Sequence, residues 1–201
     1  MLDVVKKKLI LFLSLFIYIT LGLITLIHPQ SEYEDFMPLS LGNRWVYGYT
    51  QVGEKDELKD EYAEEVVAID TINDIKYFQI KVSKIGKDSR TLYFYHKRTS
   101  CDTLFALYFD DETGQYTEII DAIFSMNVGE VFSVKNKDDS SKGCMRKISV
   151  KKKSESNIEL FLSNTCVIDA EELIVYKKGI GIVLKSYTWG GQTKLLDYSI
   201  N

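Results

Sequence analysis

The chain has 201 residues, of which 45% are hydrophobic and 27% are charged. This composition is close to that of average globular proteins and excludes disordered, collagen-like and disulfide-dense small proteins. The net charge of −4 provides no basic surface for nucleic acid, which is therefore not an expected partner. Residues 31–201 are enough for one domain with its own hydrophobic core.

The N-terminus has the pattern of an export signal. Three lysines at positions 6–8 precede an uncharged apolar run from Leu9 to Ile27, and polar residues follow. As a helix that rises about 1.5 Å per residue, this run is about 28 Å long, close to the hydrocarbon thickness of a bilayer. The lysines favour the cytoplasmic side of the membrane. We therefore predict that residues 1–28 form a signal peptide or signal-anchor helix and that the rest is exported.

Cleavage and retention of this leader are both open. The apolar run is longer than a usual signal core, and no A-x-A-like site follows it, which favours a retained anchor. No cysteine lies near the boundary to accept a lipid. The expected location is the membrane, with the domain facing the periplasm or exterior, or the secreted fraction if the leader is removed.

The three cysteines allow at most one disulfide within the chain. Cys144 and Cys166 lie in neighbouring segments and are the preferred pair in an oxidising compartment, with Cys101 left over. The alternative is that all three are small buried hydrophobic residues. Their spacing matches no metal-binding pattern.

Short runs rich in Val, Ile, Tyr, Phe and Thr, many of them alternating with polar residues, predict β-strands from residue 45 onward. In chain order, these runs cover residues 45–52, 61–70, 75–85, 91–96, 103–109, 129–135, 145–153, 158–162, 173–176, 182–189 and 192–200. Residues 118–126 are the one stretch considered as a short helix. The turns between the runs are short and polar, as in antiparallel hairpins.

The predicted fold is mainly β, with a single antiparallel meander that forms a strongly curved sheet or an open barrel. A meander of this length must curl to cover its apolar face. A sandwich of two sheets is the alternative. The expected organisation is the leader at residues 1–28, a linker at 29–42 and the antiparallel β domain at 43–201.

The excess of aromatic residues in the predicted strands is the feature most suggestive of binding. Several of these residues share a strand face, and they either form the core or line a groove for an apolar ligand. The candidate groove residues are Trp45, Tyr47, Tyr49, Tyr93, Tyr95 and Trp189.

No catalytic, cofactor or metal site is predicted. His96 is the only histidine beyond the leader, at the end of a predicted strand, and the chain contains no G-x-S-x-G nucleophile motif. Gly179 and Gly181 lack the third glycine of a phosphate loop and instead suggest a bulge or a close backbone approach. We expect no enzymatic activity, although two carboxylates from separate strands leave a hydrolase as a less favoured alternative.

Two segments carry a family resemblance. Residues 36–47 read F-x-P-L-x-x-G-N-x-W-x-Y, and residues 176–183 read Y-x-x-G-x-G-x-V. Together they resemble segments at the start and near the end of many uncharacterised bacterial secreted proteins and lipoproteins. The resemblance implies an exported, mostly antiparallel β domain, and it brings no catalytic residues. This chain differs from the lipoproteins because it has no acylatable cysteine.

The resulting functional hypothesis is an exported envelope protein without enzymatic activity. It would contact the membrane through its N-terminal helix and bind an apolar ligand or an envelope protein partner in the concave face of the sheet. The alternative is a structural or assembly protein that uses exposed strand edges.

Overall fold

The computed structural model describes residues 33–51, 60–110, 114–135, 145–165 and 171–201. The chain divides into two compact units, residues 1–30 and 31–201, and every described residue belongs to the second. The predicted leader at residues 1–28 and the predicted disulfide partners Cys144 and Cys166 lie outside the described residues. Within the described ranges, no helix has the length and hydropathy needed to cross a membrane.

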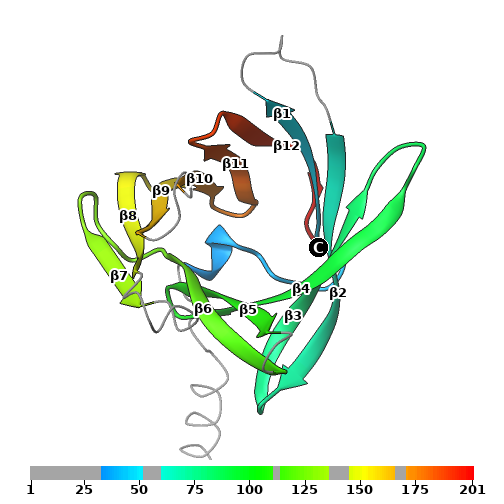
Figure 1. The fold of residues 1–201 in the computed structure, drawn as a ribbon, viewed down its shortest axis with the longest axis horizontal. Helices are drawn as coiled ribbons and strands as arrows, with labels where there is room; N and C mark the ends of the chain where they lie inside the picture. The colour runs from blue at the N-terminus through cyan, green and yellow to red at the C-terminus, as the bar shows by residue number, and fades with distance from the viewer. Residues whose placement is uncertain (1–32, 52–59, 111–113, 136–144, 166–170) are drawn as a thin grey trace, which may run out of the picture. The chain divides into compact units, whose positions relative to one another are not determined.

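The described strands form one antiparallel sheet that follows a short 3₁₀ helix, η1 (Glu34–Phe36) (Figure 1). They are β1 (Arg44–Gln51), β2 (Asp60–Ile72), β3 (Ile75–Lys84), β4 (Arg90–Ser100), β5 (Thr103–Asp110), β6 (Gln115–Ile123), β7 (Val131–Lys135), β8 (Met145–Lys153), β9 (Asn157–Asn164), β10 (Glu172–Lys177), β11 (Gly181–Tyr187) and β12 (Gly191–Ser199). The predicted antiparallel meander is confirmed. The short helix considered for residues 118–126 is wrong, since β6 covers most of that range.

The strand order gives the sheet its shape. The order is β6-β5-β4-β3-β2-β1-β12-β11-β10-β9-β8-β7, so the first strand pairs with the last and the edges are β6 and β7. Figure 1 shows the sheet curling around an interior without closing into a barrel. The two-sheet sandwich is therefore wrong, because a single continuous sheet contains all the described strands.

Strong curvature has local causes in the strand ladders. Register shifts occur in six of them, including one that leaves Leu196 of β12 without a partner on β1 and one that leaves Val183 of β11 without a partner on β10. Each such bulge bends its strand and increases the local twist. The β2–β3 hairpin turns on Asn73 and Asp74, both with positive φ, as a tight primed turn requires.

The described part of the predicted linker, residues 33–42, belongs to the folded domain. Phe36, Met37 and Leu39 are buried in the main core cluster, and the Phe36 ring stacks on Phe124 at 5.4 Å between centroids. The prediction of a simple linker at residues 29–42 is therefore corrected for these positions. The reason is that their side chains fill the interior of the curled sheet, where burial of large apolar groups is favourable.

Trp45 joins the two ends of the domain. Its fully buried indole N–H donates a hydrogen bond to the carbonyl of Ile180. Next to it, Gly181 has φ +104°, and a Cβ atom there would lie 3.3 Å from both Trp45 Nε1 and Met37 Sδ. The close backbone approach expected at this glycine is confirmed, and the two segments of the family resemblance meet at this contact.

The gap between β6 and β7 is bridged by side chains of β8. Lys153 Nζ donates hydrogen bonds to the carbonyls of Phe124, Ser125 and Met126 at 2.9, 3.2 and 3.0 Å. These carbonyls belong to the connection that leaves β6 and leads to β7. Lys153 therefore fixes the position of this connection against the other half of the sheet.

Replacing Lys153 by Met should destabilise the fold by about 1–3 kcal/mol, because three partly buried carbonyls lose a charged donor. Urea unfolding measures the loss, and hydrogen exchange should show faster opening of the β6–β7 connection. Lys152→Met is the matched control, since this neighbouring side chain is 81% exposed in a 3.6 Å ion pair with Glu159 and should contribute less than about 1 kcal/mol. Equal losses in the two variants would contradict the bridging role.

Candidate functional site

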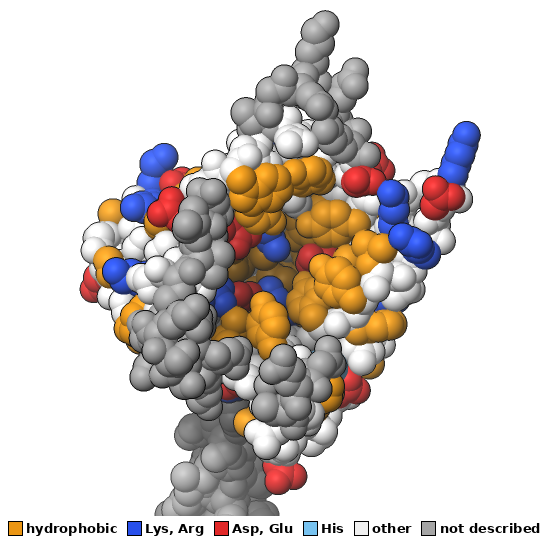
Figure 2. Space-filling view, viewed as in Figure 1, with side chains coloured by type: hydrophobic (Ala, Val, Ile, Leu, Met, Phe, Trp, Pro, Cys, Tyr) orange, Lys and Arg blue, Asp and Glu red, His pale blue; other side chains and the backbone are white. Residues whose placement is uncertain are grey.

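A cavity of about 720 Å³ lies inside the curl of the sheet. Its walls come from strands β2, β4, β5, β6, β8, β10 and β11. Figure 2 shows a hollow in this face, with hydrophobic side chains around its mouth and charged side chains of both signs inside. Its volume is in the range of small-molecule sites in proteins.

The mouth of the cavity is aromatic because β4 and β5 separate there. These strands pair only between residues 96–100 and 103–107, so the beginning of β4 and the end of β5 diverge. The aromatic residues on this part of the lining are Tyr93, Phe94, Tyr108, Phe109 and Tyr116. Each is between 43% and 56% exposed. A contiguous exposed apolar patch of this kind is typical of a binding surface.

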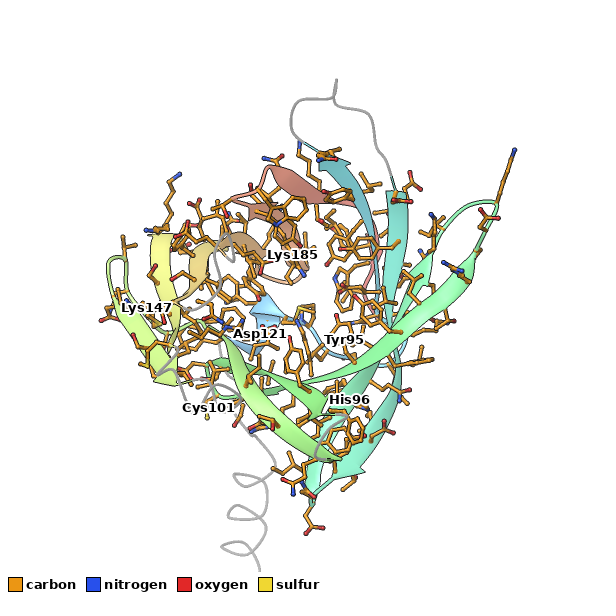
Figure 3. The ribbon with its side chains drawn as sticks, in the orientation of Figure 1. Tyr95, His96, Cys101, Asp121, Lys147 and Lys185 are labelled. Carbon is orange, nitrogen blue, oxygen red and sulfur yellow. The ribbon has the colours of Figure 1, made fainter. Side chains whose placement is uncertain are left out.

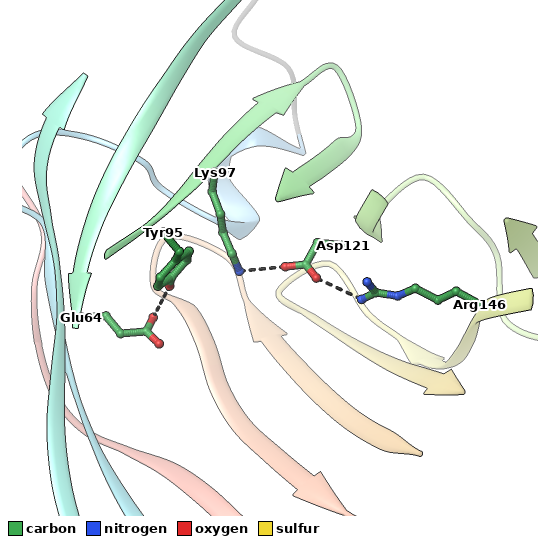
Figure 4. Close-up of polar contacts among 5 residues, drawn as sticks. All are labelled: Glu64, Tyr95, Lys97, Asp121 and Arg146. Carbon is green, nitrogen blue, oxygen red and sulfur yellow. Dashed lines mark hydrogen bonds and ion pairs between the residues drawn. The ribbon is translucent and has the colours of Figure 1, made fainter. Parts of the chain in front are cut away.

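The floor of the cavity contains a carboxylate held between two cations (Figure 4). Asp121 Oδ2 lies 2.8 Å from Lys97 Nζ, and Asp121 Oδ1 lies 3.1 Å from Arg146 Nη2. Burial by itself would raise the pKa of Asp121, but the two cations outweigh it and hold that pKa well below its usual range. Asp121 is therefore ionised. This side of the floor then has the two positive charges of Lys97 and Arg146 and the one negative charge of Asp121.

A second carboxylate, Glu64 on β2, lies on another side of the cavity. Its side chain is almost completely buried and accepts a hydrogen bond of 2.9 Å from the Tyr95 hydroxyl (Figure 4). Burial, followed by the charge of Glu64 and this hydrogen bond, raises the pKa of Tyr95 well above its ordinary value. Tyr95 is therefore a neutral hydroxyl that donates to Glu64 at neutral pH.

Lys185 on β11 and Glu172 on β10 complete the charged lining. Figure 3 shows Lys185 and Asp121 inside the curl, whereas Lys147 lies on its outer side. Burial lowers the pKa of Lys185, but nearby Glu64, Tyr62 and Glu172 raise it more, so the ammonium stays charged. Within the described part of the chain, no carboxylate lies within 4.0 Å of Lys185 Nζ.

Tyr176 contributes an unsatisfied hydroxyl to the cavity wall. The side chain is fully buried, and its hydroxyl has no hydrogen-bond partner among the described residues. Burial raises its pKa well above the ordinary value, so the group is a neutral donor and acceptor. A buried hydroxyl without a partner is energetically costly, which makes this position a natural contact for a polar ligand group.

The structure brings only part of the predicted aromatic groove together. Tyr93 and Tyr95 line the cavity, whereas Trp45 and Tyr47 are fully buried in the core. Tyr49 and Trp189 form a separate ring pair with centroids 6.1 Å apart and are not among the residues that line the cavity. The six residues therefore do not form one groove, because bulges and strand ends place them in three environments.

The charged lining was missed by the sequence analysis, although the sequence contained a signal for it. The sequence analysis considered aromatic residues alone as candidates for the groove. Several charged residues of the lining, however, stand two positions from a buried apolar residue in the same strand, and therefore on the same face. The three clear cases are Glu64 before Val66, Arg146 before Ile148 and Glu172 before Ile174.

His96 has a different position from the one predicted. It lies inside β4 rather than at a strand end, and its Nε2 lies 2.7 Å from Asp70 Oδ2. Gln79 donates to the same carboxylate oxygen at 3.1 Å. Among the described residues, no group of three His, Cys, Asp or Glu side chains could hold a metal ion. Cys101 is exposed in the turn between β4 and β5, so it is not a buried hydrophobic residue.

Comparison with known proteins yields one structural similarity. No family model matches the sequence, and no curated protein matches it. The chain is similar to the crystal structure of a candidate lipoprotein from Parabacteroides distasonis, with a TM-score of 0.48 and 13% sequence identity. The match covers 82% of this chain and 98% of that chain. A similarity this weak does not establish a common family, so the function has to be inferred from the cavity.

Replacing Glu172 by Gln should stabilise the protein at neutral pH. Burial is the main cause that raises the Glu172 pKa in the folded state, against the opposing charge of Lys185. The unfolded Glu titrates near about pH 4.3. The contribution of this group to stability is therefore present below about pH 4 and lost as the pH rises through the raised folded pKa.

Thermal unfolding at two pH values tests this prediction. The Glu172→Gln variant and the unmodified protein should have similar Tm values at pH 4, and the variant should have the higher Tm at pH 8. The exposed neighbour Glu171 provides the control Glu171→Gln for the loss of one negative charge. The same gain in both variants at pH 8 would show that net charge, rather than burial of Glu172, is responsible.

Proposed function

We propose that this chain is an exported envelope protein that binds a small amphipathic molecule in the cavity and has no enzymatic activity. The observation that carries the proposal is the combination of an exposed aromatic mouth with a charged floor in one cavity of ligand size. Aromatic rings gain free energy when a ligand covers them, and a few fixed polar groups orient it. The sequence analysis expected a purely apolar ligand. Because the floor of the cavity is charged, we propose instead a ligand that also has a polar end.

The sequence supports the location. The basic and apolar leader at residues 6–27 is the pattern of an export signal. A retained helix would keep the domain at the membrane surface, facing the periplasm or exterior, and cleavage would release it. Either outcome places the cavity outside the cytoplasm, and the proposal needs no cofactor.

Binding fits the carboxylates of the cavity better than hydrolysis does. Asp121 is engaged by two cations, and Glu64 accepts a hydrogen bond from Tyr95. A general acid or base must be free to exchange a proton with the substrate. Glu172 has a raised pKa, but it would have to act without a second carboxylate that is free of such contacts, and glycoside hydrolysis requires a pair.

Removing two aromatic side chains from the mouth tests the proposal. Native mass spectrometry of the full-length protein, purified from its membranes, should show a bound small molecule. The double variant Tyr93→Ala, Tyr108→Ala should lower its occupancy about tenfold or more, because two ring contacts of about 1 kcal/mol each are lost. Tyr198→Ala is the matched control, since Tyr198 is similarly exposed but lies outside the cavity lining.

Two results count against ligand binding. The first is an unmodified protein that carries no small molecule, and the second is an equal loss of ligand in the control variant. The alternative assembly role has one observation in its favour, since among the described strands β6 and β7 each have an outer edge that pairs with no other strand, and open edges accept further strands. A protein partner in place of a small molecule in the same spectra would support that role.

A further inference from the structure

The charges around the cavity divide into two sets with opposite net charge. In the first set, Lys97 and Arg146 share Asp121, which leaves one positive charge in excess. In the second set, Glu64 and Glu172 are the carboxylates whose charges raise the pKa of Lys185, and all three side chains line the cavity, which leaves one negative charge in excess when both carboxyls are ionised. Figure 4 shows Glu64 and Arg146 at opposite ends of the row of polar residues. The cavity therefore has a positive side and a negative side.

The positive side has spare hydrogen-bond donors. A lysine ammonium has three donors and an arginine guanidinium has five, but Lys97 and Arg146 each use one on Asp121. Both oxygens of Asp121 are already occupied. The guanidinium of Arg146 is well suited to bind a further carboxylate through two parallel hydrogen bonds.

The negative side has spare acceptors. An ionised carboxylate offers about four acceptor positions, and Glu64 receives one hydrogen bond, from Tyr95. Within the described residues, Glu172 receives no side-chain hydrogen bond or ion pair from Lys185 at 4.0 Å or less. Glu64 and Glu172 therefore both have acceptor positions free for an ammonium group.

The unsatisfied hydroxyl of Tyr176 supplies an independent sign of a polar ligand. It lines the same cavity and is fully buried without a partner among the described residues. Tyr176 lies four residues after Glu172 on β10, so it shares that strand with part of the negative set. A ligand peptide group or ammonium in the cavity would satisfy this hydroxyl as donor or acceptor.

From this arrangement we propose that the ligand is a zwitterion of the amino-acid class, a short peptide of two or three residues. Its carboxylate binds Arg146 and Lys97, its ammonium binds Glu64 and Glu172, and its apolar side chains pack on the tyrosines at the mouth. The cavity volume of about 720 Å³ exceeds that of a single amino acid. This inference rests on the proposed function, since it specifies the chemistry of the molecule that occupies the cavity.

A set of four peptides tests the inference by titration calorimetry. The probes are the dipeptide Ala-Phe, its N-acetylated form, its C-amidated form and the form with both ends blocked. The protein is the full-length chain in lipid nanodiscs. Ala-Phe should bind tightest, and blocking either end should weaken binding about tenfold or more, which corresponds to about 1.4 kcal/mol for each lost charge contact.

Single variants should remove the recognition of one end only. Arg146→Met should abolish the difference in affinity between Ala-Phe and its C-amidated form. It should keep the difference in affinity between Ala-Phe and its N-acetylated form. Glu172→Gln should abolish the difference in affinity between Ala-Phe and its N-acetylated form and keep the difference from the C-amidated form. This variant is expected to fold because it removes a charge that is partly buried. Lys147→Met is the control, since Lys147 is an exposed cation beside Arg146 on the outer side of β8, and it should leave both differences intact.

The outcomes separate this inference from the proposed function. Equal binding of all four peptides would overturn the recognition of a zwitterion. So would binding of laurate, a simple apolar anion, without binding of Ala-Phe, although the cavity would then still be a ligand site. If neither laurate nor any peptide binds, and the purified protein carries no small molecule, both the inference and the proposed function fail.

Discussion

Replacing Asp121 by Asn should destabilise the protein by about 3–5 kcal/mol, because one buried and one largely buried cation lose the carboxylate that neutralises them. The Lys97 and Arg146 side chains that remain charged are only 8% and 20% exposed, so water solvates these charges poorly. Urea unfolding at pH 7 measures the loss. The matched control is Glu65→Gln, which breaks a 3.1 Å ion pair with Lys81 in which both side chains are about one-third exposed. That loss should be less than about 1 kcal/mol.

The effect of Asp121→Asn should also depend on pH in a defined direction. The pKa of Asp121 is lowered in the folded state, so its contribution to stability is present above the unfolded pKa of about 3.9. It is lost as the pH falls below that value toward the lowered folded pKa. The difference between Asp121→Asn and the unmodified protein should therefore shrink below about pH 4. A difference that stays constant across this range would show that the carboxylate charge is not the cause.

Replacing Trp45 by Ala should cost about 3–5 kcal/mol, because it opens a large cavity in the core. Trp45 is fully buried, and the variant also leaves the Ile180 carbonyl without the indole donor. Unfolding in urea, followed by circular dichroism, measures the change.

The other tryptophan provides the control for Trp45. Trp189 is 52% exposed and stacks on Tyr187 with 5.0 Å between ring centroids. Trp189→Ala should cost far less than Trp45→Ala, since about half of the Trp189 side chain remains in water. Similar losses in the two variants would contradict the role of Trp45 as a fully buried core residue.

The strands were the most predictable part of the fold. Period-two alternation and short polar turns depend on neighbouring residues alone, so runs such as 75–85 and 145–153 matched β3 and β8 closely. The turn at residues 70–74 was also readable, because Asn and Asp tolerate the positive φ that Asn73 and Asp74 adopt. Glycine at position 181 marked a close backbone approach for the same local reason.

The candidate site was less predictable. Tyr93 and Tyr95 were recognised as possible binding residues, but the ion pairs of Asp121 with Lys97 and Arg146 were not. These side chains come from strands far apart in the sequence. Charge alone does not say which face of a strand is buried, and six register shifts change the alternation within the ladders.

The sequence by itself determined a chain of antiparallel hairpins and the turns between them, since each of these depends on residues close together in the chain, whereas the export-type leader stays a prediction. Only the tertiary structure decided that β1 pairs with β12, that the sheet opens between β6 and β7, and that residues 36–39 enter the core. It also decided that charges of both signs face one cavity. These features depend on curvature accumulated over the whole sheet, which no local pattern contains.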